Sequence, residues 1–115
     1  MKSIHYALQG LLIAVRSERN MRIHIAAAML VITAGFFFKL SQTEWMILLF
    51  CISFVIAMEL MNTALEYVCN AAVPQFHPFI RHAKDMAAGA VLVAAIASAI
   101  TGGIIFIPKI IVLFL

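Results

Sequence analysis

The sequence predicts an all-helical integral membrane protein, with a surface helix at the N-terminus followed by three transmembrane helices. Of its 115 residues, 65% are hydrophobic and only 11% are charged. A globular domain in water carries roughly 25% charged residues, so this composition suits a chain whose solvent is the bilayer. Polar residues and prolines divide the chain into one amphipathic segment and three long apolar segments. The length allows a single domain, residues 1–115.

The first segment, residues 2–17, has the pattern of an amphipathic helix. Apolar residues recur at helical spacing from Ile4 to Val15, while Gln9 and Arg16 fall on other faces of the helix. A helix of this kind lies along a membrane surface rather than across the bilayer. We therefore expect a surface helix before the first span.

The first two spans follow. The first is expected at about residues 23–38, where Arg22 and Lys39 flank a short apolar run and can extend their charges toward water. The second is expected at about residues 45–71. It begins at Trp45, a residue type that favours the membrane–water interface.

The third span is expected at about residues 83–107. Pro74 and Pro78 end the preceding helix, because proline removes a backbone donor and clashes with the turn before it. Pro108 is expected to mark the exit of the third span. The six apolar residues after Lys109 either stay at the interface or extend the helix.

The charge distribution predicts the orientation of the chain. Lysines and arginines are more frequent on the cytoplasmic side of membrane proteins. Six of the eight lie before the first span or around the second loop, namely Lys2, Arg16, Arg19, Arg22, Arg81 and Lys84. The opposite side has only Lys39 and Lys109. We therefore expect the N-terminus to be cytoplasmic.

The second span carries two carboxylates, although each costs at least ~2.5 kcal/mol in the hydrocarbon region. At about 100° per residue, five polar residues share one face of this helix. This polar stripe consists of Glu59, Asn62, Thr63, Glu66 and Asn70. Its acids are two turns apart. An alternative is that they serve only in helix packing, but neutral polar residues would do so at lower cost.

Further charged groups belong at the same membrane boundary. Glu18 precedes the first span, and Lys84 and Asp85 open the third. Mg²⁺ is typically held by one or two carboxylates together with water and substrate phosphates, so Glu18 and Glu66 are candidate ligands. Lys84 is a candidate partner for phosphate. No Walker A loop or soluble-kinase signature is present, so spacing alone does not indicate ATP.

Three ordered motifs carry a resemblance to a known family. They are E-x-N-x-R-I-H from Glu18 to His24, E-x-x-N-T-A-x-E from Glu59 to Glu66, and AKDMAAGAVL from Ala83 to Leu92. Together they resemble the prokaryotic diacylglycerol kinase and undecaprenol kinase family of membrane lipid kinases, over nearly the whole chain.

This resemblance implies an activity and a setting. The family transfers the γ-phosphate of MgATP to the primary hydroxyl of a membrane lipid. The implied cofactor is Mg²⁺, and the implied partners are ATP and the lipid, with no nucleic acid. The implied assembly is a homotrimer with sites between protomers, in the bacterial cytoplasmic (inner) membrane. The motif at Glu18 and the Glu44–Trp45 pair look more like the undecaprenol branch, and diacylglycerol is the alternative substrate.

The resemblance also implies roles for individual residues. Glu59 looks like the general base, and Glu18 and Glu66 look like the Mg²⁺ ligands. The implied ATP-binding residues are Tyr6, Glu18, Glu66, His77, Lys84 and Asp85. The implied lipid-binding or site-shaping residues are Arg22, Glu59 and Asn62. The chain departs from the family at Asn70, where members usually carry Asp, so a charge is missing beside the nucleotide or metal environment.

Two other classes of protein remain open from the residues alone. A small proton-coupled transporter could use buried glutamates to bind protons and a cationic substrate in turn, although four spans would be more natural for it. A non-catalytic assembly subunit would explain the packing but would leave Glu59 without a role. A cytoplasmic C-terminus, measured with a topology reporter, would disfavour the kinase interpretation.

Overall fold

The computed structural model describes all residues from 1 to 115 and is helical almost throughout. Its four helices are α1 (Lys2–Ser17), α2 (Arg19–Phe37), α3 (Gln42–Ala72) and α4 (Pro78–Phe114). No strand is present. Helices α2, α3 and α4 each have the length and apolar composition needed to span a bilayer. The predicted fold class, an all-helical membrane protein with three spans, is therefore confirmed.

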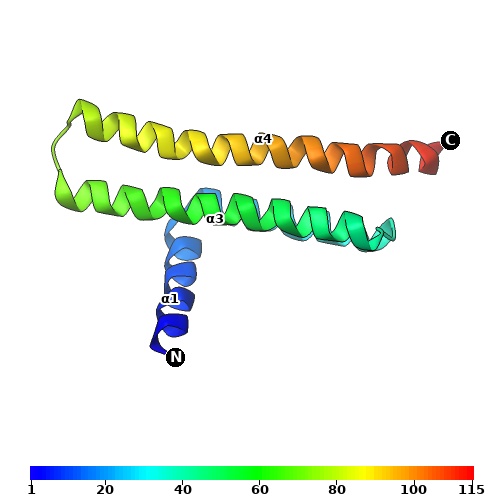
Figure 1. Ribbon diagram of the computed structural model, residues 1–115, viewed down its shortest axis with the longest axis horizontal. Coiled ribbons are helices and arrows are strands. Elements are labelled where there is room, and N and C mark those ends of the chain that lie inside the picture. Colours follow the sequence, from blue (N-terminus) through cyan, green and yellow to red (C-terminus); the bar gives the residue numbers. More distant parts are fainter.

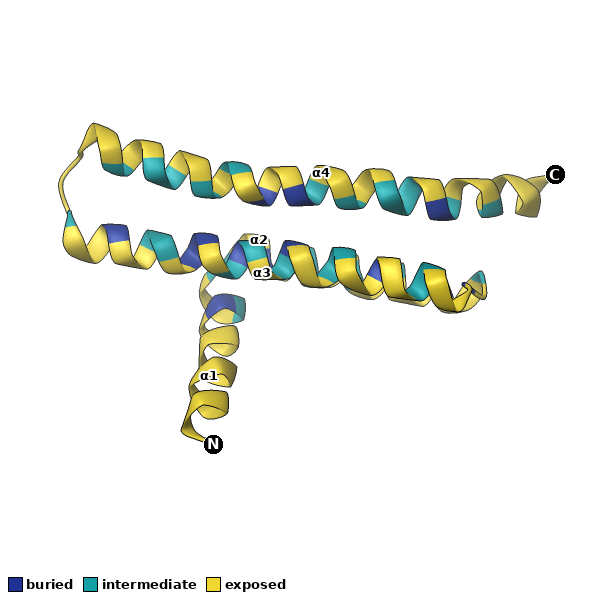
Figure 2. Cartoon of the chain, viewed as in Figure 1, coloured by how far each residue is buried: buried dark blue, intermediate teal, exposed yellow.

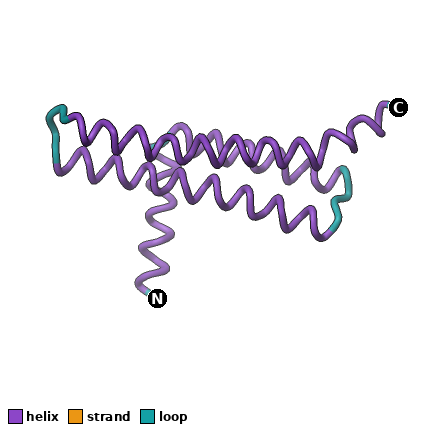
Figure 3. The backbone as a smooth tube through the Cα atoms, turned by 45° about the horizontal axis from the view of Figure 1, so that its top comes forward, coloured by secondary structure: helices purple, strands orange, loops and turns teal.

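The three long helices lie alongside one another, and α1 projects away from them (Figures 1 and 3). Helix α3 is central, because it packs against α4 along much of its length and against α2 on another side. Helices α2 and α4 have no close backbone contact with each other. The end of α1 contacts both α2 and α3. Any side chain on the inward face of α3 therefore meets residues from the other helices.

The ends of α2 and α3 follow from local hydrogen bonding. Residue Glu18, with an extended backbone at φ −114° and ψ 116°, is the only break between α1 and α2. The N-terminus of α3 has a capping box, in which the Ser41 hydroxyl accepts from the Glu44 amide at 3.2 Å and the Glu44 carboxylate accepts from the Ser41 amide at 3.0 Å. Both helices therefore begin before the apolar runs expected at residues 23–38 and 45–71.

Helix α4 exceeds the expected range of 83–107 at both ends. It begins at Pro78, which needs no hydrogen bond for its nitrogen at the first helical position. The His77 Nδ1 atom accepts from the Phe79 amide at 3.1 Å and caps this end. The helix continues past Pro108 to Phe114, so the apolar residues after Lys109 extend the helix, which was one of the two alternatives. Proline inside a helix is tolerated in membrane proteins, where neighbouring groups and local adjustments compensate.

Few apolar side chains are buried within the single chain, and most large ones face outward (Figure 2). The buried cluster of Leu40, Leu48 and Ile105 lies where the α2–α3 turn meets the second half of α4. Lys109 and Glu44 form an ion pair of 3.2 Å near the same end. An outward apolar surface is expected where the surroundings are lipid or neighbouring protomers. The other half of α3 carries the polar stripe.

A test of this packing is the substitution Gly35→Ala. A Cβ atom at Gly35 would lie 2.6 Å from Cη2 of Trp45 and 3.1 Å from Cδ1 of Leu40. We expect the variant to lose about 1–3 kcal/mol of stability, because the rigid indole ring must move. Thermal unfolding in detergent micelles measures this loss. Gly10→Ala is the control, since a Cβ atom there meets nothing within 4 Å. Equal melting temperatures for wild type and Gly35→Ala would contradict the packing.

Candidate active site

The buried polar residues of this protein all lie on α3. They are Glu59, Asn62 and Thr63, with exposed fractions of 1%, 8% and 4%. These three residues of the polar stripe therefore face into the bundle, whereas Glu66 is half-buried and Asn70 is exposed. Glu59 Oε1, Asn62 Oδ1 and Thr63 Oγ1 have no hydrogen-bond partner. Buried polar atoms without partners are rare in folded proteins and call for an explanation. A substrate hydroxyl, which has one proton, would donate to one of these oxygens.

Glu59 lies opposite His24 of α2. The distance between His24 Nε2 and Glu59 Oε2 is 3.6 Å. Glu18 and Glu66 are also close enough for their charges to act on Glu59. The site thus combines three acids with one imidazole, contributed by α2, by α3 and by the junction before α2.

Glu18 owes its place to the break between α1 and α2. The guanidinium Nη1 of Arg22 donates to the backbone carbonyls of Val15 at 2.9 Å and Arg16 at 3.1 Å. These bonds tie the first turn of α2 to the last turn of α1. The Glu18 side chain itself makes no hydrogen bond or ion pair and does not cap α2. Arg22 therefore shapes the site by holding the α1–α2 junction, and the Glu18 carboxylate stays uncommitted.

The remaining acid of the stripe, Glu66, is half-buried one turn beyond Asn62. Asn62 Nδ2 donates to Glu66 Oε1 at 3.4 Å. Glu66 Oε2 has no partner within the chain. No group of three or more histidine, cysteine, aspartate or glutamate side chains is arranged to hold a metal by itself. Two carboxylates with free oxygens, Glu18 and Glu66, nevertheless fit the few protein ligands that Mg²⁺ requires when phosphate and water supply the rest.

Helix α4 brings a cation to the end of the stripe. Lys84 Nζ donates to Asn70 Oδ1 at 3.0 Å. Asp85 instead pairs with Arg81 one turn earlier on the exposed side of α4, at 3.2 Å. Lys84 is thus joined to α3, whereas Asp85 is engaged within its own helix.

Two other predicted nucleotide residues are not brought to the stripe within one chain. Tyr6 is exposed on α1 and packs only loosely against the His5 ring. His77 caps α4. Neither forms a hydrogen bond or ion pair with a residue of the stripe.

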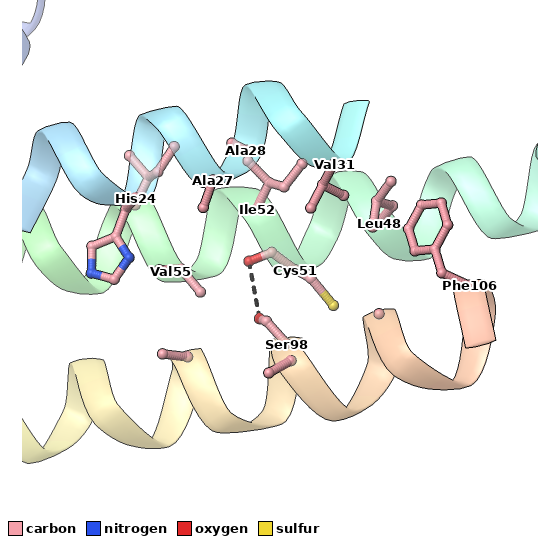
Figure 4. Close-up of a pocket in the computed structure, with 14 residues that line it drawn as sticks. His24, Ala27, Ala28, Val31, Leu48, Cys51, Ile52, Val55, Ser98 and Phe106 are labelled. Atoms are coloured by element: carbon pink, nitrogen blue, oxygen red, sulfur yellow. Dashed lines mark hydrogen bonds between the residues drawn. The ribbon is translucent and has the colours of Figure 1, made fainter. Parts of the chain in front are cut away.

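An apolar cavity of about 420 Å³ lies between α2, α3 and α4. His24 and Phe106 lie toward its opposite ends (Figure 4). Its lining is mostly aliphatic or alanine, and the Ser98 hydroxyl inside it donates to the Cys51 carbonyl at 3.4 Å. His24 therefore belongs both to the wall of an apolar cavity and to the surroundings of the buried Glu59.

His24 is the residue that sequence reasoning missed. It ends the E-x-N-x-R-I-H motif, but we expected no role for it. The available signal was its position in the first turns of a span, where an ionisable side chain needs a partner. Only the packing of α2 on α3 identifies that partner as Glu59.

The fold and the site define a small membrane protein with ionisable groups inside a bundle of spanning helices. Comparison with known families identifies it further. The family model described as prokaryotic diacylglycerol kinase matches residues 5–106, and the chain belongs to this family.

Individual relatives are consistent with this family. The chain is 44% identical to an undecaprenol kinase from Bacillus subtilis, over 94% of this chain and 88% of the relative. It is 42% identical to a diacylglycerol kinase from Synechocystis, over 92% of this chain and 61% of the relative. A diacylglycerol kinase from Haemophilus influenzae is 31% identical, with 92% and 91% covered. The transporter alternative gains no support from these relatives.

Proposed function

We propose that this chain transfers the γ-phosphate of MgATP to the primary hydroxyl of a membrane lipid at the cytoplasmic boundary of the bacterial inner membrane. Membership in a lipid kinase family supports the reaction class. The observation that carries the proposal is the carboxylate of Glu59, which is buried in a spanning helix with one oxygen uncommitted. A lipid hydroxyl reaches such a position from the bilayer, and ATP reaches the boundary from water.

In this reaction the lipid hydroxyl oxygen forms a bond to the γ-phosphorus while the bond to the bridging oxygen of ADP breaks. The hydroxyl proton must leave, and we assign its acceptance to Glu59. Because the side chain of Glu59 is only 2% exposed, bulk water does not compete for this carboxylate. Phosphoryl transfer otherwise depends mainly on positioning and on neutralising charge. We assign the positioning of the lipid hydroxyl to the buried residues of the polar stripe, Glu59, Asn62 and Thr63.

Glu18 and Glu66 are the proposed Mg²⁺ ligands. Their carboxylates act on Glu59 from the α1–α2 junction and from the next part of α3, and each has an oxygen without a partner. Bound Mg²⁺ supplies positive charge against the phosphates of ATP. Arg22 holds the junction that carries Glu18, and Asn62 orients Glu66 through the bond of 3.4 Å.

Lys84 is the proposed phosphate contact. One donor of its ammonium group goes to Asn70, and an ammonium has two more. Lys84→Gln is expected to raise the KM for ATP by about 10- to 100-fold, because a hydrogen bond to a charged group contributes about 1.5–3 kcal/mol. Initial rates at varied ATP test this. Lys39→Gln, in the turn between α2 and α3, is the control. An unchanged KM in the Lys84 variant would remove this residue from the nucleotide site.

The proposed assembly is a homotrimer with sites between protomers. It would account for Tyr6, His77 and Asp85, which the resemblance places at the nucleotide although none of them is bonded to the stripe of its own chain. A neighbouring protomer would present these residues to the nucleotide. The N-terminus is proposed to be cytoplasmic because six of the eight basic residues lie on that side.

The proposed lipid is undecaprenol, with diacylglycerol as the second candidate. The choice is supported by the E-x-N-x-R-I-H motif and by the similarity to the Bacillus subtilis undecaprenol kinase. The similarity to the Synechocystis diacylglycerol kinase is nearly as high. Both substrates present a primary hydroxyl attached to an apolar body, which suits a site where His24, the neighbour of Glu59, lines an apolar cavity.

The test is transfer of ³²P from labelled ATP in mixed micelles that contain either undecaprenol or diacylglycerol. We expect Mg²⁺-dependent label in the lipid phase, faster with undecaprenol. Glycerol, a water-soluble alcohol, is the control acceptor and should remain unlabelled. Folded protein, judged by its helical circular dichroism, that labels neither lipid would overturn the proposal. Faster labelling of diacylglycerol would reverse the assignment of the lipid.

A further inference from the structure

His24 is the one basic side chain within ion-pair distance of Glu59. The other ionisable groups acting on this carboxylate are Glu18 and Glu66, which are acids themselves. No ionisable group of α4 acts on this carboxylate, and Lys84 of that helix is bonded to Asn70. An acid inside a spanning helix is normally paired, and His24 is the available partner of Glu59.

The two oxygens of Glu59 have different surroundings. Oε2 lies 3.6 Å from Nε2 of His24. Oε1 is buried and has no hydrogen-bond partner. Rotation about the last side-chain bond of glutamate is broad, so without a partner the plane of the carboxylate would not be held in one orientation. The contact of His24 with Oε2 alone makes the two oxygens of Glu59 different.

We propose that His24 is a positioning residue for Glu59, attracting Oε2 so that Oε1 stays directed at the lipid hydroxyl. The proposal rests on the proposed function of Glu59 as the base. The side chain of His24 is 21% exposed, and its ring lines the apolar cavity at the end shown in Figure 4. It touches the carboxylate from the α2 side, as a positioning group must. Its removal should affect the rate of transfer and not the binding of ATP.

Three substitutions separate positioning from packing. In His24→Gln the amide nitrogen replaces Nε2 at nearly the same reach. In His24→Asn the same amide is one methylene shorter and falls short of Glu59. His24→Leu keeps the volume without any donor. His82→Asn, on the exposed side of α4, is the matched control.

We expect His24→Asn and His24→Leu to lower kcat by about 10- to 100-fold, which is the scale of rate loss caused by small misplacement of a reacting group. The KM for ATP and the KM for the lipid should stay within about threefold of wild type. His24→Gln should keep kcat within about threefold of wild type. If the leucine variant fails to fold, the pair of amides decides, because both keep a polar side chain at this position.

Wild-type kcat in the asparagine variant would overturn the proposal. So would equal losses in the glutamine and asparagine variants, or losses that only follow the melting temperatures. The proposed function fails separately, if wild type labels no lipid or if Glu59→Gln is fully active. Phosphoryl transfer could be abolished by Glu59→Gln and left unchanged by His24→Asn. That result would exclude the role of His24 and leave the role of Glu59 intact.

Discussion

Glu59→Gln is expected to lower kcat for lipid phosphorylation by about 10²- to 10⁴-fold, the usual contribution of a general base. Glutamine has the same shape, but its amide accepts no proton from the lipid hydroxyl. The KM for ATP should change little, because Glu59 is not among the proposed nucleotide contacts, which lie on α1, at the α1–α2 junction, farther along α3 and on α4. Initial rates of ³²P transfer in mixed micelles provide both constants.

Glu44→Gln is a matched control on the same helix. Glu44 lies at the opposite end of α3, where it caps the helix and pairs with Lys109 at 3.2 Å. Glutamine is also found at this position of capping boxes, so the helix end should persist. We expect wild-type turnover. Equal activity of the Glu59 and Glu44 variants would show that the buried carboxylate takes no proton.

Glu18→Gln and Glu66→Gln are each expected to raise the Mg²⁺ concentration for half-maximal activity by about 10- to 100-fold or more. Mutation of residues that only hydrogen-bond to a metal ligand already changes metal affinity by about this factor. Each substitution here removes a charged oxygen ligand itself. Activity is measured by titrating Mg²⁺ at fixed ATP. Binding of Mn²⁺ in the presence of ATP, followed by electron paramagnetic resonance, gives a reading that does not depend on turnover.

The effects of the two substitutions on Mg²⁺ affinity need not be additive. Both carboxylates would bind the same ion, and residues that share a partner are coupled. Glu44→Gln again serves as the control. Variants with a normal metal requirement and normal Mn²⁺ binding would exclude Glu18 and Glu66 as ligands. A lower kcat at unchanged metal affinity would place them beside the reacting groups instead.

Much of the fold was predictable because it depends on local pattern. The amphipathic pattern of residues 2–17 is matched by α1, and the three apolar runs are matched by the three long helices. Whether the helix continues past Pro108 stayed open, because the cost of this proline depends on whether surrounding groups compensate for the lost hydrogen bond, and sequence does not reveal them. The early start of α4 was missed because the capping hydrogen bond depends on the conformation of the His77 side chain, which the sequence does not show.

By itself the sequence determined the membrane class, the helices, and the sharing of one face by Glu59, Asn62 and Thr63. Composition and a period of about 3.6 residues are properties of short segments, so they need no knowledge of neighbours. Tertiary structure alone decided that this face is buried, that His24 meets one oxygen of Glu59, and that α2 and α4 leave a cavity between them. These facts depend on how far each helix is rotated and shifted against α3, and no local pattern specifies that.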